Sequence, residues 1–160
     1  MNTTYREFLI RDWQPSDRQA AATVIQHVLA EYGLGWEPEA TDQDVIAVET
    51  HYWKTNGQFW VVEHNGNVVG TAGFYPIDRS PQAVELRKMY LLPTARGQGL
   101  GRYLLQQLEQ AIAAQGFQSI WIETAAVLQT AVKLYERNGY QPADGEIACR
   151  CDRLYMKELV

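Results

Sequence analysis

Cysteine is scarce in this chain of 160 residues, which contains only Cys149 and Cys151. On a strand the two side chains would lie on the same face, two residues apart, and this spacing disfavours a mutual disulfide. Two thiolates are also too few for a zinc site, and His27, His51 and His64 are too scattered to complete one. We therefore expect free thiols in a reducing compartment and no bound metal.

Basic runs and long apolar runs are also missing. Lys and Arg number 14 against 19 Asp and Glu, which gives a net charge of −5. An acidic chain without a Lys/Arg cluster argues against a nucleic-acid or anionic-membrane partner. No apolar stretch approaches the roughly 18 residues that a membrane-spanning helix needs, and the N-terminal stretch lacks the apolar region of a signal peptide. We expect a cytoplasmic protein.

The length fits one domain, residues 1–160. Apolar periodicity predicts the following elements. The strands are 7–11, 59–63, 68–75, 84–92, 119–124, 147–151 and 153–157, and the helices are about 16–31, 44–52, 100–115 and 128–137. The order β-α-α-β-β-β-α-β-α-β-β describes an α/β (α+β) protein with helices on the faces of a mixed sheet. Asn65-Gly66 predicts a hairpin, and the helix between strands 84–92 and 119–124 predicts that these two are parallel.

The most informative stretch is the turn that follows strand 84–92. Arg96-Gly97-Gln98-Gly99-Leu100-Gly101 places glycines at alternate positions in front of an amphipathic helix. Glycine lets the backbone approach a ligand closely, and a helix start adds unpaired N–H donors and a partial positive charge. This turn therefore predicts an anion site suited to phosphate, with Arg96 and Arg102 beside it.

Two familiar phosphate motifs do not fit this turn. A P-loop carries Lys followed by Ser or Thr after its last glycine, where Arg102 and Tyr103 stand here. The dinucleotide fingerprint needs a third glycine at the position of Arg102. A protein of another fold that holds ATP at the turn stays an alternative.

The pattern that remains is Arg-x-x-Gly-x-Gly after Met89-Tyr90-Leu91-Leu92-Pro93. It resembles the pyrophosphate-binding motif of the GNAT superfamily of N-acetyltransferases, and Leu134-Tyr135-Glu136 is similar to a second stretch of that family. The resemblance implies the GNAT fold, a mixed and mostly antiparallel central sheet flanked by helices, with acetyl-coenzyme A as co-substrate. The cofactor-binding residues that we expect are Met89, Tyr90, Leu91, Arg96, Gly97, Gln98, Gly99, Leu100, Gly101, Arg102 and Thr124.

One position departs from the family pattern. Leu128 stands where the family often carries an Asn that hydrogen-bonds the pantetheine arm. We expect Thr124 or Gln129 to substitute for it.

The central strand contains an irregularity. Leu86 and Met89 are both apolar but three residues apart, so strict alternation would put them on opposite faces. One inserted residue, a β-bulge, would return both to the core, and a plain irregular edge is the alternative. The resemblance implies that this strand splays from the next one. Free backbone groups of Met89 and Leu91 would then bind the cofactor, with the Met89 N–H as oxyanion donor.

Tyr135 and Glu85 are the candidate catalytic residues. The resemblance implies that Tyr135 lies near the cofactor sulfur and acts as general acid, and a core aromatic is the alternative. It places Glu85 beside the acceptor amine as general base, for which partial burial would raise the pKa. The alternative for Glu85 is a solvated carboxylate paired with Arg87.

The acceptor site is less legible than the cofactor site. Tyr32, Trp36 and Tyr75 are candidates for an aromatic wall around an amine, although core packing explains each of them equally well. The resemblance implies direct attack of a primary amine on acetyl-coenzyme A in a ternary complex, with a small molecule or peptide as acceptor. A non-catalytic sensor that binds acyl-coenzyme A on the same fold is the alternative. We expect a monomer or homodimer.

Overall fold

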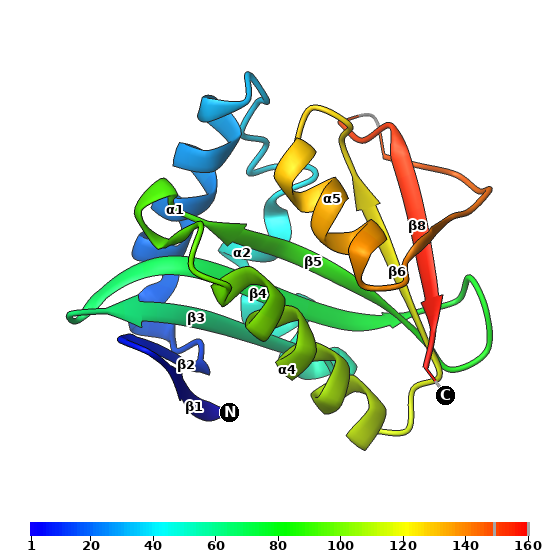
Figure 1. Ribbon diagram of the computed structural model, residues 1–160, viewed down its shortest axis with the longest axis horizontal. Helices are drawn as coiled ribbons and strands as arrows, with labels where there is room; N and C mark the ends of the chain where they lie inside the picture. Colours follow the sequence, from blue (N-terminus) through cyan, green and yellow to red (C-terminus); the bar gives the residue numbers. More distant parts are fainter. Residues whose placement is uncertain (149, 160) are drawn as a thin grey trace.

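The computed structural model describes residues 1–148 and 150–159. Within these residues the strands form one sheet in the order β1-β2-β3-β4-β5-β6-β8-β7 (Figure 1). The pairing of β5 with β6 is parallel, and the other neighbouring pairs are antiparallel. The predicted sheet, its hairpin and its parallel pair are therefore confirmed.

Most element bounds lie within a few residues of the predicted ones. The strands are β1 (Asn2–Tyr5), β2 (Phe8–Asp12), β3 (Gln58–His64), β4 (Asn67–Ile77), β5 (Ala83–Leu91), β6 (Ser119–Thr124), β7 (Gln141–Pro142) and β8 (Arg153–Glu158). The α-helices are α1 (Arg18–Glu31), α2 (Gln43–Ile46), α3 (Val48–His51), α4 (Leu100–Ala114) and α5 (Gln129–Arg137). Among the described residues, none of these helices is both long and apolar enough to cross a bilayer.

Helices cover both faces of the sheet (Figure 1). On one face α4 and α5 pack over the larger apolar cluster, to which α4 contributes Leu100, Leu104, Leu105, Leu108 and Ile112. On the other face α1, α2 and α3 enclose a second cluster that includes Trp13, Ile25, Leu29, Val45 and Tyr52. The sheet thus separates two buried layers, as alternating apolar side chains on its strands require.

Three expectations about the elements were wrong. A polar strand, β1, precedes the predicted first strand and was missed because only alternate residues of it are half-buried. The predicted helix 44–52 is two short helices, because Ala47 leaves the helical conformation (φ −122°, ψ 58°). The predicted strand 147–151 is not a strand at its described residues, and Cys149 lies outside them. Instead Gln141–Pro142 pairs with β8.

The predicted bulge in β5 is confirmed. Thr71 of β4 faces Tyr90, whereas Gly73 faces Arg87, so two steps along β4 correspond to three along β5. The extra residue brings Leu86 and Met89 into the same apolar cluster. Lys88, at the bulge, has a left-handed backbone with φ +54°.

Strands β5 and β6 separate soon after they begin to pair. Only Ala83–Glu85 pairs with Ser119–Trp121 in the register. Beyond Glu85 the two strands diverge, as the family resemblance implied. The backbone of β5 after Glu85 is therefore not paired with β6, and the space between the two strands is open to a ligand.

Candidate active site

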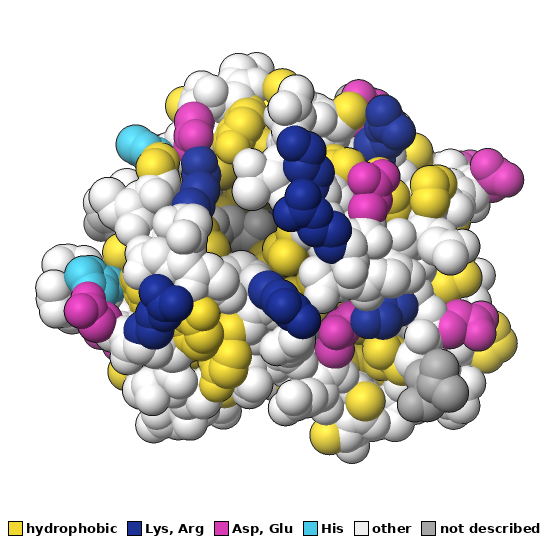
Figure 2. Space-filling view, viewed as in Figure 1, with side chains coloured by type: hydrophobic (Ala, Val, Ile, Leu, Met, Phe, Trp, Pro, Cys, Tyr) yellow, Lys and Arg dark blue, Asp and Glu magenta, His cyan; other side chains and the backbone are white. Residues whose placement is uncertain are grey.

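A cavity of about 320 Å³ lies between the splayed strands, the start of α4 and the helix α5. Figure 2 shows a hollow in this face of the molecule with Lys and Arg side chains on several sides of it. Most of the predicted site residues line the cavity together, although they come from five segments of the chain. They are Tyr32, Glu85, Met89, Tyr90, Leu91, Arg96, Gly97, Gly99, Gly101, Arg102, Thr124 and Tyr135.

The glycine turn presents its backbone to this cavity. Gly97 and Gly99 have φ of +77° and +83°, a conformation that favours glycine. Gly99 is the N-cap residue immediately before α4, and a Cβ built at Gly97 would meet no atom within 4 Å. The first N–H groups of this 15-residue helix are unpaired within it, so the turn is suited to an anion.

Four predicted site residues lie outside the cavity lining. Leu100 is buried in the apolar cluster beneath α4 because it begins the inward face of the helix. Gln98 turns its side-chain amide to the carbonyl oxygen of Thr94, 3.3 Å away. Trp36 and Tyr75 are half-buried and pack against the cluster beneath α1, and their part in an acceptor site stays a prediction.

Arg96 has partners within the protein. Its guanidinium donates to both carboxylate oxygens of Glu31, at 2.7 and 2.9 Å, and its Nε donates to the Leu91 carbonyl at 2.9 Å. Glu31 ends α1, so this ion pair joins that helix to the glycine turn. Arg102 has no comparable ion pair among the described residues and is the cation that lies freer beside the turn.

Tyr135 lies on α5 with 4% of its surface exposed. Burial raises the pKa of its hydroxyl, so Tyr135 is a neutral phenol with a proton to donate. Leu128 and Thr124 line the cavity near it, and so does Thr130, whereas Gln129 does not. Thr124 therefore stays a candidate for the contact that the family Asn makes, whereas Gln129 lies outside the cavity lining.

Glu85 is buried rather than solvated, and its partner is Arg87, whose Nη1 donates to it at 2.9 Å. Burial opposes its charge, but the hydrogen bond with Glu123 and the guanidinium of Arg87 outweigh burial and lower the pKa of Glu85. The expected rise in the pKa of Glu85 was therefore wrong. The rise falls on Glu123 of β6 instead, where burial and the adjacent Glu85 carboxyl raise the pKa.

Glu123 was missed from the sequence, and it lines the same cavity. The sequence does contain a sign of it, because Glu123 is a carboxylate within the largely apolar strand Ser119-Ile120-Trp121-Ile122-Glu123-Thr124. A charged residue in such a strand is rarely buried unless it has a partner or a function. The backbone N–H of Ala148 donates to its Oε1 at 2.6 Å, and Arg79 lies 3.6 Å from its Oε2. Glu123 and Glu85 thus form a carboxyl pair that two different strands bring together.

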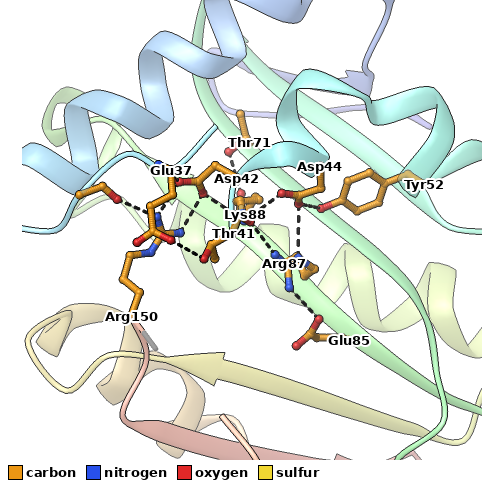
Figure 3. A network of polar contacts seen from close by, with 11 residues as sticks. Glu37, Thr41, Asp42, Asp44, Tyr52, Thr71, Glu85, Arg87, Lys88 and Arg150 are labelled. Carbon is orange, nitrogen blue, oxygen red and sulfur yellow. Dashed lines mark hydrogen bonds and ion pairs between the residues drawn. The ribbon is translucent and has the colours of Figure 1, made fainter. Parts of the chain in front are cut away.

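A chain of alternating charges extends from Glu85 across the face of the sheet that α1 and α2 cover (Figure 3). Its members, in order of contact, are Arg150, Asp42, Lys88, Asp44, Arg87 and Glu85. Asp42 and Asp44 are almost completely buried, at 0% and 3% exposed. Buried carboxylates of this kind are stable only when they are paired with cations, as they are here. The described residues contain no group of three or more His, Cys, Asp or Glu that could hold a metal.

Comparisons with known proteins agree with this geometry. Residues 21–140 match the profile of the Acetyltransferase (GNAT) family. The chain is 38% identical over 151 residues to the uncharacterized N-acetyltransferase YjgM of Escherichia coli (strain K12), which covers 89% of this chain and 90% of that protein.

Solved structures share the fold. An acetyltransferase of the GNAT family from Staphylococcus aureus Mu50 superposes with a TM-score of 0.88 at 22% identity, over 96% of this chain and 99% of that one. YncA from Salmonella typhimurium, solved with its cofactor acetyl-CoA, superposes with a TM-score of 0.75 at 21% identity, over 96% and 95% of the two chains.

Proposed function

The chain belongs to the GNAT family of acetyltransferases, and from this premise we propose that it transfers the acetyl group of acetyl-coenzyme A to a primary amine. The observation that carries this proposal is the single cavity in which the glycine turn, the bulge of β5, Tyr135 and the Glu85–Glu123 pair meet. The acceptor is a small molecule or a peptide amine. The cytoplasmic location, the single domain and the monomeric or homodimeric state stay predictions from the sequence.

The residues at the cavity fit acetyl-coenzyme A. The N–H groups at the turn before α4 would hold its pyrophosphate, with Arg102 as the nearby cation. The backbone of β5 at Met89 and Leu91, which β6 leaves unpaired, would hold the pantetheine arm. The Met89 N–H would stabilise the negative charge that develops on the thioester oxygen.

Acyl transfer to an amine needs a proton acceptor and a proton donor. We assign the acceptor role to the Glu85–Glu123 pair, with Glu123 as the member that takes the amine proton, because its raised pKa lies nearer to neutrality. The buried Tyr135 donates its proton to the sulfur of the departing coenzyme A. The amine forms the C–N bond directly, the C–S bond breaks, and its electron pair leaves with the sulfur.

A thermal-shift titration with acetyl-coenzyme A, coenzyme A and ATP tests the cofactor assignment. The informative variant is Gly101→Glu, because Gly101 lies in the first turn of α4 and a Cβ there would come no closer than 3.5 Å to Leu134. The carboxylate would repel the pyrophosphate. Gly101→Ala is the matched control, since alanine favours a helix by about 1 kcal/mol over glycine and adds no charge. Gly99 is less suitable because a Cβ there would lie 2.6 Å from the Tyr5 hydroxyl.

We expect saturable stabilisation by acetyl-coenzyme A in the wild type and in Gly101→Ala, and none in Gly101→Glu. Equal stabilisation of both variants would place the cofactor elsewhere, and selective stabilisation by ATP would favour a nucleotide-binding protein. A screen of amines with thiol release as readout then tests turnover. Tight binding without turnover of any amine would support the acyl-coenzyme A sensor.

A further inference from the structure

The backbone at Lys88 adopts a conformation that its side chain disfavours. Residues other than glycine rarely occupy the left-handed region, because the Cβ approaches the neighbouring carbonyl oxygen. Lys88 nevertheless has φ +54° inside the central strand. Such a residue persists only where its surroundings hold it, and two sets of contacts do so here.

The first set binds the side chain of Lys88, which is 4% exposed (Figure 3). Its ammonium donates a hydrogen bond of 3.1 Å to the carbonyl oxygen of Thr41. It also lies 3.3 Å from Oδ1 of Asp42 and 3.2 Å from Oδ1 of Asp44. Oδ1 of Asp44 is buried and accepts no hydrogen bond from the described residues. The positive charge of Lys88 therefore stabilises the negative charge on this oxygen.

The second contact binds the main chain. The hydroxyl of Thr71 donates a hydrogen bond of 2.7 Å to the carbonyl oxygen of Lys88. Thr71 belongs to β4 and is completely buried. In the register it faces Tyr90, so its side chain occupies the place where the bulge interrupts the ladder between the two strands.

The carbonyl of Lys88 and the N–H of Met89 belong to one rigid peptide plane. The chain has no cis peptide bonds among its described residues, so the two groups point in opposite directions across that plane. Thr71 draws the carbonyl toward β4, and it therefore directs the Met89 N–H away from β4, the direction in which β5 and β6 diverge. The cavity that Met89 lines lies in this direction.

We propose that Thr71 and Lys88 are positioning residues that together fix the peptide plane between Lys88 and Met89 and so aim the Met89 N–H at the thioester oxygen. This inference rests on the proposed function, in which that N–H is the oxyanion donor. Thr71 holds the plane from the sheet. Lys88 holds it from the segment that contains Thr41, Asp42 and Asp44.

The decisive comparison is Thr71→Val with Thr71→Ser. Valine keeps the shape of threonine and removes the hydroxyl, whereas serine keeps the hydroxyl and loses a methyl group. A displacement of a catalytic group by about 1 Å can lower the rate about a hundredfold. We expect the Met89 N–H to be displaced by less than that when the Thr71 hydroxyl is removed. In Thr71→Val we expect kcat to fall about tenfold with KM for acetyl-coenzyme A unchanged. Thr71→Ser should restore most of the rate, because the hydrogen bond to Lys88 returns.

A second readout needs no acceptor amine. The carbonyl stretch of bound acetyl-coenzyme A, labelled with ¹³C at the acetyl carbonyl, falls in frequency when a donor polarises the oxygen. We expect a lowered frequency in the wild type and in Thr71→Ser, and a frequency closer to that of the free thioester in Thr71→Val. The double variant Lys88→Met/Asp44→Asn, which removes one charge of each sign, should also approach the free value. Its melting temperature checks that it folds.

The outcomes separate this inference from the proposed function. If the bound wild-type thioester shows no lowered frequency, Met89 is not an oxyanion donor and that part of the proposed function fails. If the frequency is lowered in the wild type and is the same in Thr71→Val, the donor is real but Thr71 does not position it. Equal losses of kcat in the valine and serine variants would likewise overturn the inference, because packing alone would then explain them.

Discussion

The hydroxyl of Tyr5 donates a hydrogen bond of 2.8 Å to the main-chain oxygen of Gln98, which lies 93 residues further along the chain. Gln98 stands between the glycines of the turn, and Tyr5 ends the strand β1. The ring of Tyr5 also packs on that of Tyr103, with 4.8 Å between the ring centroids. The first strand thus supports the glycine turn from outside the cavity.

Tyr5→Phe should weaken the binding of acetyl-coenzyme A without affecting turnover. Phenylalanine keeps the ring contact and loses the hydrogen bond, which is worth about 1 kcal/mol. We expect KM for acetyl-coenzyme A to rise by up to about fivefold at unchanged kcat, the upper value being reached if all of that energy preorganises the turn. Tyr103→Phe is the control, because its hydroxyl contacts Thr3 at 3.0 Å rather than the turn. Equal effects of the two variants would contradict a specific role of Tyr5.

Tyr135→Phe should remove the proton donor. We expect kcat to fall by about a hundredfold, within the range of general acid catalysis, while the thermal shift with coenzyme A stays unchanged. Tyr140→Phe is the matched control. Tyr140 is also buried, but its hydroxyl donates to Glu109 at 2.9 Å and it does not line the cavity. A normal rate in Tyr135→Phe would assign that residue to the core.

The two carboxyl groups of the pair should differ in their effect on the pH profile. Because the pKa of Glu123 is raised, its basic form disappears as the pH falls through that value. The wild-type kcat/KM should therefore decline on the acidic side. In Glu123→Gln we expect that ionisation to vanish from the profile and the rate at its plateau to drop by about a hundredfold. If instead Glu85→Gln removes the same limb and Glu123→Gln leaves it, the roles of the two residues are exchanged.

The substitution Glu123→Gln should also stabilise the fold above the pKa of Glu123. A carboxyl whose pKa is raised by folding contributes stability below its unfolded pKa of about 4.3, and that contribution is lost as the pH rises through the folded value. Glutamine cannot ionise, so Glu123→Gln avoids this loss. We expect its free energy of unfolding in urea to exceed that of the wild type at pH 8 and to approach it near pH 4.

Arg150→Leu should destabilise the protein. Arg150 donates to both carboxylate oxygens of Asp42, at 2.6 and 2.8 Å, and the removal of one partner of a buried ion pair costs about 3 kcal/mol. Burial opposes the charge of Asp42, but the bonds from Arg150 and from the Glu37 backbone outweigh it and lower its pKa. The stability that Asp42 contributes is therefore lost only as the pH falls through this lowered value. In Arg150→Leu we expect that acid-induced loss to begin at a higher pH, as measured by urea unfolding from pH 7 to pH 3.

Local patterns were sufficient to predict the framework of the fold. The glycine turn, the periodicity of α4 and the spacing of Leu86 and Met89 each depend on nearby residues of the chain, and the turn, the helix and the bulge that they predict are confirmed, while the anion site at the turn stays a prediction. The short helices α2 and α3 were harder to predict because Ala47, the residue between them, is a good helix former. The break there is a tertiary effect, since Asp44 turns inward to Tyr52, Arg87 and Lys88.

The polar part of the site could not be predicted in this way. The Glu85–Glu123 pair joins two strands that are separated by a helix, and the Arg150–Asp42 ion pair joins residues 108 positions apart. In each pair, the sequence around one residue does not indicate which residue will be its partner. The pKa of Glu85 illustrates the consequence, because burial alone predicts a rise, whereas the hydrogen bond with Glu123, which the tertiary structure supplies, and the guanidinium of Arg87 two residues away reverse its direction.

The short parallel pairing of β5 with β6 joins the two halves of the sheet at one end only, so it can act as a hinge between them. Three paired positions, from Ala83 to Glu85 and from Ser119 to Trp121, are the joint between one half made of β1–β5 and another made of β6–β8. A small rotation about a joint displaces the far ends of its two arms most. Met89 lies on one arm, and Tyr135 follows the other along the chain. Ala83 and Ser119 are both buried at this joint, so we expect a larger side chain at either position to change the separation of β5 and β6 near Met89.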